Sequence, residues 1–265
     1  MDTQIHINYD TAFGEDDEMS QTDIHNALIV YLMSVLSRLF SGRNIGVFTS
    51  ISLYGAPLSP SRYKSPDLLV IDGLVSNPNQ EIASYTIDSD HPAPRVLMEI
   101  CSEGNWQNDV ETDQKPAIYA QMGVPEYFAV DPHIEQVWTG EWLQQGRLIG
   151  WRLNGQTHNY QRILPDARGW FWSEQLNCYL VIEAPYGRTL HLYDATGQLL
   201  LTDEEAERQA KLAERLAKLA AQQQVETERL AKLVAQRQNE NAQQQNERLK
   251  ERLRQLDPNF NENDW

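Results

Sequence analysis

The sequence is poor in cysteine and lacks the common patterns that bind zinc or phosphate. Its 265 residues include two cysteines, Cys101 and Cys178, which lie far apart along the chain. Two isolated thiols exclude a disulfide framework and a four-thiolate zinc site, and they are typical of a reducing compartment. The six histidines form no HxxxH or HxH spacing, and neither common glycine-rich phosphate loop occurs. We therefore expect neither a zinc enzyme nor a P-loop protein.

Long apolar runs are also missing. No stretch approaches the roughly 18 to 20 apolar residues that a membrane-spanning helix needs. Residues 1–22 have neither the basic region nor the apolar core of a signal peptide, and we expect this acidic segment to be flexible. With 41% hydrophobic residues and seven tryptophans, the rest can form a core. The sequence therefore predicts a soluble, cytoplasmic protein with no membrane partner.

Basic charge is scarce in most of the chain. Residues 1–202 hold 11 Lys and Arg against 25 Asp and Glu, whereas residues 203–265 hold 11 against 13. A protein that binds phosphates through counterion release normally has a basic face, and this composition offers little charge for one. Any binding of nucleic acid is therefore expected to be local, metal-dependent or weak.

The pattern between residues 23 and 202 predicts one α/β domain. Apolar side chains at helical spacing predict an amphipathic helix over 22–40, and 113–123 predicts a short helix with Pro116 in its first turn. Short apolar runs bounded by Pro, Gly or Asp predict strands in four segments: 44–55, 65–73, 93–103 and 125–132. This order predicts a single small mixed sheet flanked by helices.

Residues 133–182 change to alternating segments separated by turn residues, which predict added β-hairpins. These segments are QVWTGEWLQ, GRLIGWRL and HNYQRIL. The aromatic-rich stretch 166–183 favours core packing over a ligand platform or a base-stacking platform, because tryptophan buries a large area.

From Asp203 the composition shifts to Ala, Glu, Lys, Arg, Gln and Leu, and ERLAKLAAQQQ from Glu214 recurs as ERLAKLVAQRQ from Glu228. This offset is two heptads, and it predicts a coiled-coil helix over 203–257, followed by a flexible tail over 258–265. Leucines with 4-3 spacing form its seam: 212, 216, 219, 230 and 233. Gln223, Glu226, Arg237 and Gln244 weaken that seam, and the leucines at 249, 253 and 256 are shifted by two residues. The helix indicates a homo-oligomer or another partner, and the alternative is a solvated single helix.

Glu99 lies in the apolar run VLMEICSE, where an unpaired ionised carboxylate costs several kcal/mol or becomes neutral. It is therefore either paired or bound to a cation. Asp67 opens the preceding predicted strand, and Lys115 lies near the start of the short helix. If these elements meet at one sheet edge, the two carboxylates suit Mg²⁺ or Mn²⁺, and the lysine suits a role beside a metal-activated water. Spacing alone leaves this open, because acidic residues at strand ends are common.

Three segments carry a family resemblance: SPDLLVIDG, PRVLMEICSE and NDVETDQKPAIYAQMGVPEYFAVDP. They resemble the restriction endonuclease family of the Uma type, a bacterial branch of the PD-(D/E)XK nuclease superfamily. The resemblance extends to GWFWSEQLNCYLVIE and LRQLDPN, and so covers most of the chain. It implies a restriction-endonuclease-like core with Asp67 and Glu99 as metal-binding catalytic carboxylates, the backbone carbonyl of Ile100 as a third ligand, and Lys115 beside the attacking water.

The sequence departs from the superfamily motif at Cys101, where a lysine is expected two residues after Glu99. The resemblance implies Lys115 as the substitute, and we assign no role to Asp109 or Glu111. His25 either reaches the metal or phosphate or is a partly exposed helix residue. Tyr119, one helical turn after Lys115, either positions that lysine or belongs to the core.

Two functions of different class follow from the sequence. The first is a Mg²⁺-dependent endonuclease that hydrolyses DNA phosphodiester bonds. The alternative is a catalytically inactive, nuclease-like assembly module that acts through its coiled coil.

Overall fold

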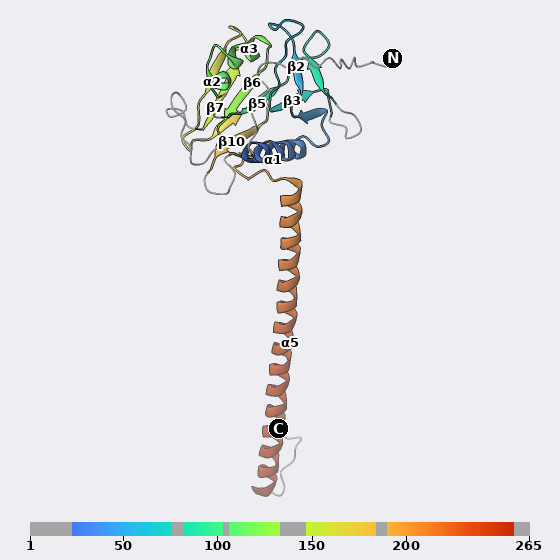
Figure 1. Cartoon of the computed structure of the whole chain (residues 1–265). Coiled ribbons are helices and arrows are strands. Elements are labelled where there is room, and N and C mark those ends of the chain that lie inside the picture. Colours follow the sequence, from blue (N-terminus) through green and yellow to red (C-terminus); the bar gives the residue numbers. More distant parts are fainter. Residues whose placement is uncertain (1–22, 76–81, 103–105, 133–146, 184–189, 257–265) are drawn as a thin grey trace. The chain divides into compact units, whose positions relative to one another are not determined.

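The computed structural model describes residues 23–75, 82–102, 106–132, 147–183 and 190–256. It divides the chain into two compact units, 1–203 and 204–265. The mixed α/β class is confirmed, with helices beside a mixed sheet and a long C-terminal helix (Figure 1). The segments expected to be flexible, 1–22 and 258–265, and the predicted hairpin segment QVWTGEWLQ lie outside the described residues.

A six-stranded mixed sheet forms the centre of the first unit. Its strands lie in the order β1 (Ile45–Phe48), β3 (Leu68–Asp72), β5 (Val96–Ile100), β6 (Glu126–Val130), β7 (Leu148–Leu153) and β8 (Tyr160–Ile163). The neighbours β5 and β6 are parallel, and the other neighbouring pairs are antiparallel. A parallel pair needs a crossover connection, and α2 (Trp106–Val110) and α3 (Lys115–Gln121) supply it.

Different helices cover the two faces of this sheet. On one face, α1 (Asp23–Leu39) packs its buried side chains, such as Leu32, against Met98 of β5. The opposite face holds Leu97 together with Tyr119 of α3. Because successive side chains of a strand point to opposite faces, Glu99 lies on the side of α2 and α3. All five residues of β5 are buried, as the apolar run around Glu99 predicts.

Two smaller sheets complete the described part of this unit. Strands β9 (Phe171–Ser173), β10 (Cys178–Ile182) and β11 (Leu190–Tyr193) form an antiparallel sheet, and β2 (Ser52–Tyr54) pairs in parallel with β4 (Ser84–Thr86). The expected hairpins are present as β7–β8 and β9–β10. The prediction of a single sheet was wrong. The run 44–55 turns at Ser50, whose φ is +54°, and so divides between two sheets.

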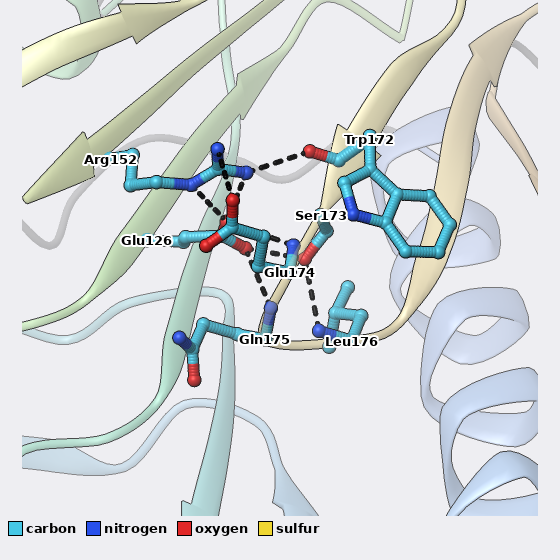
Figure 2. A network of polar contacts seen from close by, with 7 residues as sticks. All are labelled: Glu126, Arg152, Trp172, Ser173, Glu174, Gln175 and Leu176. Atoms are coloured by element: carbon cyan, nitrogen blue, oxygen red, sulfur yellow. Dashed lines mark hydrogen bonds and ion pairs between the residues drawn. The ribbon is translucent and has the colours of Figure 1, made fainter.

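A polar network around the buried Glu126 carboxylate links the β9–β10 hairpin to the central sheet (Figure 2). Glu126 of β6 is fully buried, and its Oε1 lies 2.8 Å from Nη2 of Arg152 on the neighbouring strand β7. The same carboxylate accepts hydrogen bonds from the Ser173 hydroxyl and from the backbone N–H groups of Glu174 and Gln175. Because these three donors belong to one turn, the network fixes the hairpin in place.

The second unit contains α5 (Asp203–Leu256), which begins at the unit boundary and has 54 residues. None of its residues is buried, and ion pairs one turn apart follow its surface, such as Glu207 with Lys211 and Glu214 with Lys218. The long helix is therefore present, while the coiled coil stays a prediction. Among the described residues, no helix is long and apolar enough to cross a membrane.

Candidate functional site

Asp67 and Glu99 meet at one end of the central sheet. The antiparallel register pairs Leu68 with Met98, so one further step places Asp67 opposite Glu99. Residues directly opposite each other on antiparallel strands have side chains on the same face. In addition, Oδ2 of Asp67 accepts a hydrogen bond from the N–H of Ile100 at 2.7 Å. The structure thus brings together the two carboxylates that the sequence singled out.

Lys115, the first residue of α3, reaches the same place. Its Nζ lies 3.1 Å from Oε1 of Glu99 and 2.8 Å from Oδ1 of Asp109. Burial disfavours the charged ammonium, but the two carboxylates outweigh this effect and raise the pKa of Lys115 above its ordinary value. Lys115 is therefore a buried cation, and it supplies the partner that Glu99 needs.

One lysine does not neutralise the site. Burial raises the pKa of Glu99 to about 8. The negative charges of Asp109 and Asp67 also raise this pKa, whereas the positive charge of Lys115 lowers it. The Tyr119 hydroxyl donates a hydrogen bond to Oε1 of Glu99 at 2.7 Å. Lys115 contacts this same oxygen, so Oε2 has no hydrogen bond within the described part of the chain. The site therefore has an excess of negative charge and an acceptor atom, Oε2 of Glu99, that could bind a further cation.

Asp109, to which the sequence analysis assigned no role, lies beside Lys115 at the site. It is 3% exposed, and burial raises its pKa while the charge of Lys115 opposes that rise. Its backbone carbonyl accepts a hydrogen bond from the Tyr127 hydroxyl at 2.7 Å, which ties α2 to the sheet. Glu111, the other acid considered before Lys115, is exposed. Asp109 could have been identified by its position six residues before Lys115, because a chain that turns after a short helix can bring two such side chains together.

The structure shows the surroundings of three further residues that the sequence analysis considered. His25 is 6% exposed, and its Nε2 lies 3.2 Å from Oδ1 of Asp67, so the alternative of a partly exposed helix residue was wrong. Tyr119 is buried and contacts Glu99. Cys101 faces the core as expected, and burial raises the pKa of its thiol, which makes it a poor nucleophile.

The donor set fits a cation of the magnesium type. Within the described ranges, no three or more His, Cys, Asp or Glu side chains form a group that could hold a metal ion. Two carboxylates suffice for Mg²⁺, which binds proteins through one or two of them and keeps several waters. The N–H of Cys101 donates to the carbonyl of Val130 on β6. The Ile100 carbonyl belongs to the same peptide bond and points in the opposite direction, away from β6, as does the Ile100 N–H that donates to Asp67. The Ile100 carbonyl therefore lies on the same side of β5 as Asp67.

A family model of known proteins matches most of this domain. Residues 2–178 match the Uma2 family, described as "Putative restriction endonuclease", which is more than half of the chain. The chain belongs to this family of restriction-endonuclease-like proteins.

A crystal structure from Anabaena variabilis, described as a "putative nuclease belonging to DUF820", has 18% sequence identity and a TM-score of 0.39 over 58% of this chain and 74% of that chain. A search of curated proteins found no match.

Proposed function

We propose that the protein is an endonuclease that hydrolyses DNA phosphodiester bonds with Mg²⁺ or Mn²⁺. The observation that carries this proposal is the meeting of Asp67, Glu99 and the buried cation Lys115 at one end of the sheet. Membership of a restriction-endonuclease-like family supports the reaction class. The excess negative charge of the site supports a bound divalent cation.

Each site residue then has a defined task. Asp67, Glu99 and the Ile100 carbonyl would hold the cation, which when bound lowers the pKa of a water and neutralises charge on the phosphate. Lys115 stays protonated, orients the attacking water and stabilises the negative charge that develops on the phosphoryl oxygens. Asp109 keeps Lys115 in place through the 2.8 Å ion pair. His25, which contacts Asp67, orients that carboxylate.

We also propose that the protein forms a homo-oligomer through α5.

The alternative, a catalytically inactive assembly module, drew support from the missing lysine at position 101. Because Lys115 lies 3.1 Å from Glu99, a lysine is present at the carboxylates, and the structure favours the enzyme.

Cleavage of supercoiled plasmid tests the proposal. We expect the parent protein to nick or linearise plasmid with Mg²⁺ or Mn²⁺ and to leave it intact with EDTA. Glu99→Gln and Asp67→Asn keep the shape of each side chain but remove one ligand charge, and we expect each to lower the rate at least about 100-fold. Glu111→Gln, which removes an exposed carboxylate, serves as the matched control and should cleave like the parent.

Two results would contradict this assignment. Equal rates for the parent and for both ligand variants would show that the activity does not arise at these carboxylates. Intact plasmid with folded parent protein, across DNA substrates of varied sequence, would favour the assembly module.

A further inference from the structure

The helix α5 leaves a stripe of leucines in water. Their exposed fractions range from 48% to 58%, and they follow the 4-3 spacing of a coiled-coil seam: Leu212, Leu216, Leu219, Leu230 and Leu233. Ion pairs within the helix lie beside this stripe, for example Glu214 with Lys218. A long helix with an apolar stripe on one side and charges on the other is stable when a partner covers the stripe.

We propose that the partner is a second copy of this chain, whose α5 runs antiparallel, with the two-fold axis between Gln224 and Val225. This inference rests on the proposed association through α5, and it adds orientation and register. In this alignment Leu216 faces the partner's Leu233, and Leu219 faces the partner's Leu230. Symmetry repeats both contacts, so two leucine pairs lie on each side of the axis, four in all.

The polar residues of the seam select this orientation. In a parallel, in-register pair Glu226 would face the partner's Glu226, and Arg237 would face the partner's Arg237, which places like charges in the seam. In the antiparallel pair, neither Glu226 nor Arg237 faces the same residue of the partner, so the like charges lie apart. Glu226 then faces the partner's Gln223, whose amide can donate to it, and Arg237 faces the partner's Leu212 at the end of the seam, where its guanidinium reaches water.

The internal repeat has a purpose in this arrangement. Residues 214–221 of the first repeat lie against residues 228–235 of the partner's second repeat, so similar segments supply the leucines on both sides of the axis. Residues beyond 246 extend past the partner's Asp203. The leucines at 249, 253 and 256 lie in that extension, and they are the ones shifted by two residues from the seam. They need not keep the heptad register, because no partner helix lies beside them.

The alignment also sets the distance between the starts of the two helices. With a rise of 1.5 Å per residue, the two Asp203 residues lie about 65 Å apart along the paired helices.

Crosslinking between single-cysteine variants tests the orientation. Both natural cysteines are buried, so Leu212→Cys and Arg237→Cys each introduce one exposed thiol and keep the four leucine pairs. After co-expression with different tags, a short bismaleimide should crosslink the two variants to each other. Neither variant alone should crosslink, because equivalent positions of an antiparallel pair lie about 37 Å apart. Ala221→Cys, on the opposite side of the helix, should give no crosslink with either.

Each possible result decides the proposal. A parallel coil would give the reverse pattern, in which each variant crosslinks to itself and the mixture forms no mixed product. A monomeric mass for the full-length parent in light scattering at micromolar concentration would overturn the pairing itself. Because neither measurement depends on cleavage, an inactive protein with the expected crosslinks would contradict the nuclease assignment alone.

Discussion

Replacement of Lys115 by methionine is expected to lower the rate of plasmid cleavage at least about 100-fold and to destabilise the folded protein by about 3–5 kcal/mol at pH 8. Methionine preserves most of the side-chain volume, so the effect isolates the charge. The ammonium is the compensating cation for two buried carboxylates, Glu99 at 3.1 Å and Asp109 at 2.8 Å. Without it, both carboxylates remain buried without a cation.

This loss of stability depends on pH. Folding raises the pKa of Glu99 from 4.5 to about 8 even with Lys115 present, so ionisation of this carboxyl destabilises the folded state as pH rises through that window. In the Lys115→Met variant the pKa rises further, and ionisation costs more. At pH 5 the variant can keep Glu99 protonated in the folded state. We therefore expect the difference in unfolding free energy between parent and variant to be largest at pH 8 and smallest at pH 5.

Urea unfolding in EDTA at both pH values measures the stability, and plasmid cleavage at pH 8 measures the activity. Lys211→Met, which removes an exposed lysine paired with Glu207, is the matched control and should change the unfolding free energy by less than about 1 kcal/mol. A second variant, Lys115→Met with Asp109→Asn, should recover part of the lost stability but no cleavage, because it removes one unpaired carboxylate without restoring the cation. Equal stability losses at pH 5 and pH 8 would show that the charge of Lys115 does not compensate the two carboxylates.

The main features of this site follow from the sequence because they lie in strong local patterns. A carboxylate inside a continuous apolar run is conspicuous, and Glu99 lies in such a run. Asp67 directly precedes another buried strand, so the pairing of β3 with β5 is enough to bring it close. Lys115 begins a helix marked by Pro116 at its start.

The parts that the sequence did not predict depend on contacts between distant segments or on very short elements. Asp109 lies on α2, which has five residues and too few turns to show a helical period. The strand β4 has three residues and is defined mainly by its pairing with β2. His25 contacts an aspartate 42 residues away, so nothing in its own helix separates a site residue from a surface residue.

The network around Glu126 was missed for the same reason. Glu126 lies in a strand whose residues are all buried, as Glu99 does, but its partners come from two later elements of the chain, β7 and the β9–β10 turn. The two buried glutamates differ in what surrounds them. Glu126 has hydrogen-bond donors at both oxygens, and Glu99 has them at one. This difference is consistent with a structural task for Glu126 and a chemical task for Glu99.

Glu126→Gln is therefore expected to destabilise the folded protein, lowering the unfolding free energy by about 3 kcal/mol. The amide nitrogen of glutamine is a donor, and it would face an Arg152 nitrogen, the Ser173 hydroxyl or a backbone N–H, all of which now donate to the carboxylate. In a domain of this size such a loss lowers the melting temperature by roughly 6–12 °C. Cleavage per folded molecule should stay unchanged, because the network lies apart from the site contacts of Lys115.

Glu174→Gln is the matched control, because Glu174 binds the same guanidinium of Arg152 at 2.8 Å but its side chain is 56% exposed. An exposed ion pair contributes at most about 1 kcal/mol, so the expected change in melting temperature is a few degrees at most. Calorimetry of both variants measures this contrast. Limited proteolysis adds a local measurement, since only Glu126→Gln removes an acceptor oxygen that anchors the β9–β10 hairpin. Equal shifts for the two variants would show that burial of the Glu126 carboxylate adds nothing beyond its contact with Arg152.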